Sequence, residues 1–169
     1  MDDPRLPRML YVFLVLACLL MMGYYYPQMP QRMASHFAAD GSPNGWMPRD
    51  SFFLLTCLIC ASSALVTFFA PWQIASKSDV RINLPNKGYW LAPQRRDATM
   101  RYIASTMAWF GCALLFVLIS GSFLALRANL TLGQRFNSDA MLLVLGGFLF
   151  FLMILIIGMI RHFQTAPKT

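Results

Sequence analysis

The chain has 169 residues, of which 57% are hydrophobic and 12% charged, with a mean hydropathy of +0.52. These values lie outside the range of an ordinary soluble domain, so we do not expect a water-soluble enzyme. The formal net charge of +7 is explained by membrane topology and anionic lipid, and no nucleic-acid partner is expected.

Four long stretches contain no Asp, Glu, Lys, Arg or His. They cover residues 9–26, 51–72, 102–126 and 140–160. At about 1.5 Å of rise per residue, each is long enough to cross a hydrocarbon core of about 30 Å as a helix. Because lipid offers backbone groups no hydrogen-bond partner, each stretch should be α-helical. The sequence therefore predicts an all-α polytopic membrane protein, a four-transmembrane-helix bundle forming a single membrane domain over residues 1–169.

The first stretch has some features of a secretory signal, because Arg5 and Arg8 precede its apolar run. No small-residue cleavage site follows closely, however. The stretch ends in three consecutive tyrosines at residues 24–26, and such aromatic groups are typical of the membrane interface. We predict that this segment is a retained helix.

Basic residues are distributed unevenly between the loops. Ten of the 14 Lys and Arg lie in the two termini and in the loop of residues 73–101, and four lie in the other two loops. Loops rich in Lys and Arg remain on the cytoplasmic side of a membrane. Both termini and the 73–101 loop are therefore predicted to be cytoplasmic, and the 27–50 loop to lie outside.

The outer loop, residues 27–50, is too rich in aromatic and turn-forming residues to be a plain spacer. Asp40 and Gly41, and then residues 43–45 (Pro-Asn-Gly), are turn signals, so we expect the loop to fold. His36 and Asp40 could pair or bind a cation if this segment were helical, but two ligands make a weak metal site, and we expect no metal or cofactor. The residues that we predict to bind a ligand are His36, Phe37, Asp40 and Trp46.

The inner loop, residues 73–101, contains the segment INLPNKGYWLAPQRRD. Pro85 and Pro93 bracket a short turn, and aromatic residues precede two arginines. Aromatic rings prefer the headgroup layer and arginines reach lipid phosphates, so this segment should lie along the membrane or dock a cytoplasmic partner. The residues expected to make these contacts are Lys87, Tyr89, Trp90, Arg95 and Arg96.

The four cysteines, Cys18, Cys57, Cys60 and Cys112, all fall inside the apolar stretches. The spacing of Cys57 and Cys60 would suit a metal or redox pair, but no His or carboxylate accompanies them, so we favour a role in helix packing. Small residues at four-residue spacing, including Ala104, Ala108 and Cys112, and the glycines at 146 and 147, predict further close helix contacts.

No ionisable residue lies inside a span, and we find no catalytic constellation or phosphate-binding glycine loop. A proton relay, an ion path or an enzyme site would be expected to need such groups. We therefore expect a non-enzymatic protein.

The stretch YYPQMPQRMASHFAADGSPNGWMPRD has a proline-flanked entry, then His-Phe, Asp-Gly and Pro-x-Gly-Trp. It resembles the short domain of unknown function found at the start of bacterial SdpI-like membrane proteins. The segment NLPNKGYWLAP is similar to one that follows the second helix in a subset of proteins with that domain. The resemblance implies a helical protein of the bacterial inner membrane, some of whose relatives are membrane sensors or immunity proteins against secreted toxic peptides.

Two functional hypotheses follow. The first is a sensing or immunity-type binding module that recognises a peptide or envelope ligand through its outer loop. The alternative is a structural or accessory subunit of a larger inner-membrane complex. The expected partners are a bilayer with anionic lipids, and either further copies of the chain or other membrane subunits.

Overall fold

The computed structural model describes residues 3–78, 81–131 and 135–165. Four helical segments are long and apolar enough to cross a membrane, as predicted, so the chain is a multi-pass, all-α membrane protein. The elements are α1 (Arg5–Tyr25), the short 3-10 turn η1 (Tyr26–Gln28), β1 (Arg32–Phe37), β2 (Pro43–Pro48), α2 (Arg49–Ala64), the π-helical η2 (Leu65–Phe69), α3 (Ala70–Ala75), α4 (Lys87–Trp90), α5 (Pro93–Leu130) and α6 (Ser138–Gln164).

Helices extend beyond the charge-free stretches from which they were predicted. The largest difference is at α5, which begins at Pro93, nine residues before the predicted start at residue 102. Proline suits the first turn of a helix because its missing N–H is not needed there. The charged residues that follow it do not interrupt the helix, because a helix that leaves the lipid can carry charge.

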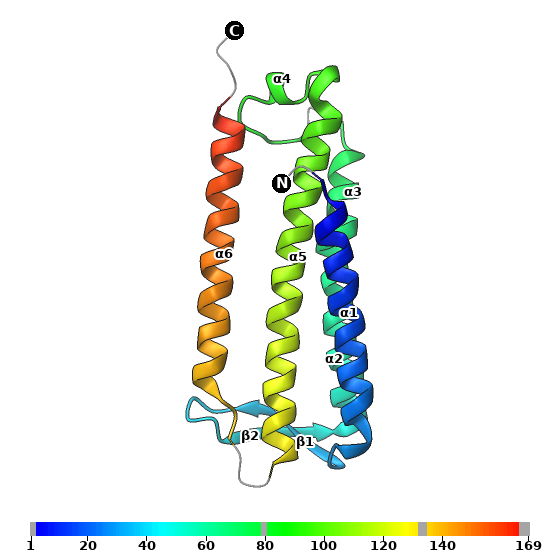
Figure 1. Cartoon of the computed structure of the whole chain (residues 1–169), viewed down its shortest axis with the longest axis vertical. Helices are drawn as coiled ribbons and strands as arrows, with labels where there is room; N and C mark the ends of the chain where they lie inside the picture. The colour runs from blue at the N-terminus through cyan, green and yellow to red at the C-terminus, as the bar shows by residue number, and fades with distance from the viewer. Residues whose placement is uncertain (1–2, 79–80, 132–134, 166–169) are drawn as a thin grey trace.

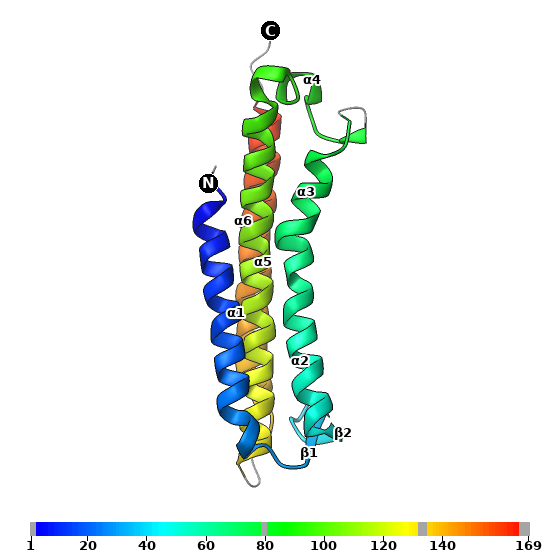
Figure 2. The same cartoon turned by 90° about the vertical axis from the view of Figure 1, so that its right-hand side faces the viewer.

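Helix α5 is the centre of the bundle. In Figure 1, α6 lies on one side of α5, while α1 and α2 lie on the other; Figure 2 shows that α1 and α2 flank α5 from opposite sides. The β1–β2 hairpin lies at one end of the bundle, called here the hairpin end. The short helix α4 lies at the other, the α4 end, and both ends of the described chain lie toward it (Figure 1).

The π-helical segment η2, which continues α2, packs closely against α5. Thr67, in this segment, is fully buried, and its hydroxyl donates to the carbonyl of Ser63 at 3.2 Å. A Cβ added to Gly111 of α5 would overlap the Thr67 hydroxyl. The close approach of α2 to α5 therefore requires glycine at position 111.

Three of the cysteines are buried at helix contacts, which agrees with the predicted packing role. The thiol of Cys112 donates to the carbonyl of Pro7 in α1 at 3.0 Å, while Cys18 and Cys60 face one another between α1 and α2. Cys57 is half-buried. Within the described part of the single chain the glycines at 146 and 147 contact no other helix, because the space where their Cβ atoms would be is open.

Candidate functional site

The outer loop folds into an antiparallel hairpin. Ala34 pairs with Trp46, and His36 with Gly45, with register irregularities on both sides of His36. The chain reverses through residues 38–42, where Gly41 adopts a φ of +79° that favours glycine. The predicted turn at Asp40 and Gly41 is confirmed. The second predicted turn, at residues 43–45, is wrong, because these residues pair with β1 as part of strand β2.

One face of the hairpin is fastened to α5 by a single amide side chain. Asn129 accepts a hydrogen bond from the Ala34 N–H at 2.6 Å and donates to the Ala34 carbonyl at 2.9 Å. It also donates to Ala125 in its own helix at 2.8 Å. On the same strand, Met33 is completely buried. Asn129 thus satisfies both polar groups of a buried strand residue and fixes β1 on the end of α5.

The turn of the hairpin is fastened to the connection between α5 and α6. The N–H of Phe136 donates to the Gly41 carbonyl at 2.9 Å, and the Phe136 ring stacks on Phe37 with centroids 4.9 Å apart. Arg135 forms an ion pair with Asp40 at 3.2 Å. The hairpin therefore crosses the end of the bundle from α2 to α6, as Figure 1 shows.

Asp40 is exposed, and its carboxylate organises the turn. The side-chain hydroxyl of Ser42 donates to Oδ1 at 2.6 Å and its backbone N–H donates to the same oxygen at 3.0 Å. These hydrogen bonds, with a smaller contribution from the Arg135 charge, lower the pKa of Asp40 below its ordinary value. The role of Asp40 in the described contacts is thus to hold the turn.

The opposite face of the hairpin carries exposed side chains, among them Arg32, His36 and Trp46. The Arg32 guanidinium lies 5.8 Å from the centroid of the Trp46 ring, and Trp46 is 50% exposed. His36 is also exposed, and its Nδ1 lies 3.0 Å from the Ser35 hydroxyl. We call Arg32, His36 and Trp46 the outward face of the hairpin.

The four predicted ligand-binding residues therefore do not form one cluster. His36 and Trp46 belong to the outward face, whereas Phe37 and Asp40 make the contacts with Phe136 and Arg135 just described. Arg32 was missed by sequence reasoning. Its place near Trp46 depends on the hairpin register, and that register cannot be read from either residue alone.

The base of the hairpin holds a polar cluster. The Tyr26 hydroxyl donates to Oδ1 of Asp50 at 2.7 Å, and the Arg49 guanidinium lies 5.1 Å from the Tyr26 ring centroid. A cavity of about 240 Å³ beside them is lined by Gly23, Tyr26, Asp50 and Phe53. No site was predicted at these residues from the sequence alone.

At the α4 end, the inner loop packs against the last turns of α6. The Trp90 indole N–H and the Asn86 side chain each donate to the Phe163 carbonyl at 3.0 Å. The His162 ring stacks between two aromatic rings, with centroid separations of 4.7 Å to Trp90 and 3.9 Å to Tyr102. The sequence alone did not predict this stack, because His162 lies 60 or more residues along the chain from Trp90 and Tyr102.

The five residues predicted to contact lipid or a partner fall into two groups: some contact other parts of the protein and some stay exposed. Arg96 donates to the carbonyls of Ala75 and Lys77 at 3.1 Å each, at the end of α3. Trp90 is half-buried against α6. The Arg95 guanidinium stacks on Tyr89 at 3.9 Å, and Arg95 and Lys87 are exposed. Lys87 and Arg95 are thus the members that remain exposed, while Tyr89 is half-buried beside Arg95.

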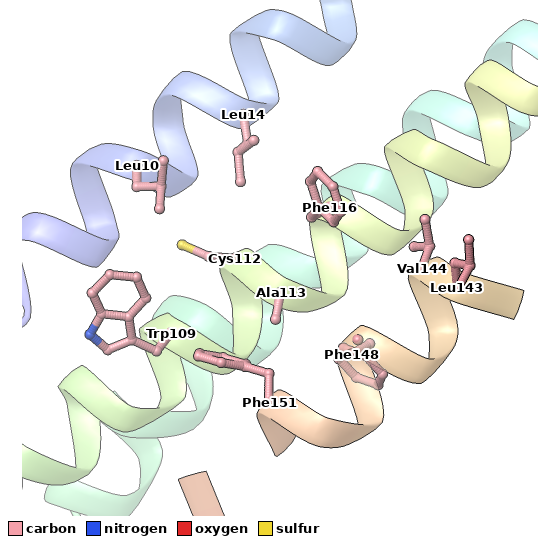
Figure 3. Close-up of a pocket in the computed structure, with 11 residues that line it drawn as sticks. Leu10, Leu14, Trp109, Cys112, Ala113, Phe116, Leu143, Val144, Phe148 and Phe151 are labelled. Carbon is pink, nitrogen blue, oxygen red and sulfur yellow. The ribbon is translucent and has the colours of Figure 1, made fainter. Parts of the chain in front are cut away.

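A cavity of about 460 Å³ opens between α1, α5 and α6 within the spans (Figure 3). Leu10 and Leu14 line it from α1, and Trp109 and Phe116 line it from α5, while aromatic and aliphatic side chains of α6 close the other wall. Its lining is almost entirely apolar. Among the described residues, no group of three or more His, Cys, Asp or Glu could hold a metal ion.

Residues 13–60 match the family model of a domain of unknown function, DUF1648. The matched stretch covers most of α1, the whole hairpin and the first turns of α2 through Cys60. It amounts to somewhat more than a quarter of the chain. No curated protein and no solved structure matches the chain.

Proposed function

We propose that this protein is a non-enzymatic, sensing or immunity-type binding module that recognises a peptide or another envelope ligand through the outward face of its hairpin. The observation that carries the proposal is the arrangement of the hairpin itself. One face is fixed to the bundle by Asn129 and Phe136, while Arg32, His36 and Trp46 stand exposed on the other. A rigid support of this kind lowers the entropy that a binding surface loses when it takes up a ligand.

The chemistry of the outward face favours a peptide. Tryptophan and arginine are the residues most often responsible for binding energy at protein interfaces. Here they lie together, since the Arg32 guanidinium is 5.8 Å from the Trp46 ring centroid. The resemblance of the outer segment to SdpI-like proteins, some of which act in immunity or sensing, supports the same function.

The proposal places the protein in the bacterial inner membrane with the hairpin outside. The excess of Lys and Arg in the termini and the 73–101 loop supports this orientation. Lys87 and Arg95, exposed at the α4 end, would then face anionic lipid headgroups of the cytoplasmic leaflet.

Photo-cross-linking in living cells, with the photoreactive group in the hairpin, tests the proposal. A photoreactive amino acid at position 46 should give adducts with a peptide or envelope protein, and the Arg32→Ala change should reduce them. The same amino acid at Trp72, an exposed tryptophan of α3, is the matched control. Adducts with lipid alone at position 46, or the same adducts from position 72, would contradict the proposal.

A second candidate function, an accessory subunit of a larger membrane complex, is favoured by one observation. Helix α6 contributes few buried residues, and the positions around Gly146, Gly147 and Gly158 are open. Small residues on an open helix face permit another transmembrane helix to approach closely. Purification in mild detergent followed by native mass determination should then recover partner subunits or further copies in fixed stoichiometry, and recovery of a lone monomer would count against this function.

A further inference from the structure

Two thiols face one another in the middle of the bundle. The Cys18 thiol of α1 donates a hydrogen bond to the sulfur of Cys60 in α2, with 3.5 Å between the two sulfur atoms. The two residues are 1% and 5% exposed. They are 42 positions apart in the chain, so only the packing of α1 on α2 brings them together.

Nearby contacts hold the two helices in this register. The Tyr11 hydroxyl lies 2.8 Å from the Ser63 hydroxyl, one turn beyond Cys60, and the Tyr11 ring packs edge-on against Phe68 at 5.3 Å. A disulfide bond is about 2.0 Å long, so the two sulfur atoms would need to approach by only about 1.5 Å.

The other cysteines are placed differently. The Cys112 thiol donates to the Pro7 carbonyl on another contact of α1, and Cys57 is half-buried. The structure therefore distinguishes one pair, Cys18 and Cys60, from the remaining two cysteines.

The depth of the pair limits what can react with it. Cys18 precedes the end of α1 by about two turns, and Cys60 follows the start of α2 by about three, which corresponds to roughly 11 to 16 Å from the hairpin end. The pair therefore lies at the depth of the hydrocarbon core, a layer that a charged or water-soluble oxidant does not enter readily. A lipid-soluble oxidant of the quinone class does enter this layer.

We propose that Cys18 and Cys60 form a reversible disulfide whose oxidant is a membrane quinone. The two S–H bonds break and one S–S bond forms. The two electrons and two protons released by the thiols reduce the quinone to the quinol. The new bond would close a covalent loop around the hairpin and join the two helices that carry it, a property that goes beyond the binding function proposed above.

The test uses the full chain, reduced and reconstituted in lipid bilayers, with decylubiquinone as the probe. After oxidation, the protein is denatured, its remaining thiols are alkylated, and peptides are identified by mass spectrometry. The number of alkylated cysteines should fall from four to two, with a Cys18–Cys60 linked peptide that disappears on reduction. Cys112→Ser, the matched control, should form the same link, and Cys18→Ser should form none.

Folded and detergent-denatured samples of the unsubstituted protein provide a comparison that does not depend on the folding of any variant. The folded protein should link Cys18 to Cys60 selectively, and the denatured protein should give mixed pairings. Two results in the folded sample would overturn the proposal. One is alkylation of all four cysteines after oxidation, and the other is a yield of links to Cys57 or Cys112 equal to that of the Cys18–Cys60 link.

Discussion

Asn129 shows how one side chain can connect a loop to a helix bundle. Ala34 is buried, and a buried backbone N–H or C=O group without a partner is costly. The Asn129 amide supplies one acceptor and one donor to the same residue. The outward face of the hairpin depends on this connection, because it keeps the opposite face in place.

Replacement of Asn129 by alanine should therefore loosen β1. We expect a loss of about 1–3 kcal/mol in the free energy of unfolding, since two backbone groups lose their partner. Hydrogen exchange in residues 32–37 should become faster. The matched control is Asn44→Ala, at an exposed position of β2, and the account would be wrong if both variants changed exchange equally.

Acidification should affect the turn through Asp40. Its pKa is lowered in the folded protein, so its stabilising contribution is complete above the ordinary carboxyl pKa of about 3.9 and is lost as the pH falls through the lower, folded value. The turn should stay unchanged from pH 7 to pH 5 and loosen only in stronger acid. Carboxyl NMR of Asp40, followed together with the Ser42 amide signal, measures this; a transition near neutral pH would contradict it.

Individual site residues were only partly predictable from sequence. His36 and Trp46, which were selected as candidate ligand contacts, are exposed. Phe37 and Asp40 were selected on the same grounds, yet they contact Phe136 and Arg135. The partners lie about a hundred residues further along the chain than Phe37 and Asp40. No local sequence pattern predicts a contact at that separation.

Among the elements, the contact between η2 and α5 places a strict requirement on one residue, Gly111. The π-helical turn directs Thr67 into α5, and Gly111 leaves just enough room for it. Irregular turns of this kind are short and have no clear signature in composition. The sequence predicted the helix correctly and gave no sign of the irregularity within it.

Substitution of Gly111 by alanine should force α2 and α5 apart. The expected loss is about 1–3 kcal/mol, as for other insertions into a filled core. Gly158→Ala, in α6, is the matched control, because the space around Gly158 is open and alanine is the better helix former. Thermal unfolding in detergent distinguishes the two, and equal melting temperatures would show that the contact at Gly111 is unimportant.

The four spans were the most predictable elements, since lipid imposes both their length and their helical backbone. Their ends were less predictable. Helix α5 continues past its charge-free stretch to Pro93, and strand β2 includes residues expected to form a turn. Proline in the first turn of α5 and strand pairing in β2 account for these boundaries, which composition alone does not indicate.

At the scale of the whole molecule, the bundle has two chemically different ends. The hairpin end carries the outward face of the hairpin, while the α4 end carries Lys87, Arg95 and the aromatic stack around His162. The distribution of basic residues predicts that these ends lie on opposite sides of a membrane, with the hairpin outside. The proposed recognition of an envelope ligand requires that orientation.

Thiol labelling in intact spheroplasts tests this requirement most directly. A cysteine introduced at His36 should react with a membrane-impermeant maleimide added from outside, whereas a cysteine at Lys87 should react only after the membrane is permeabilised. The unsubstituted protein measures the background, since its own cysteines lie within the spans. Labelling of the Lys87→Cys variant in intact spheroplasts, with the His36→Cys variant protected, would contradict the proposed function.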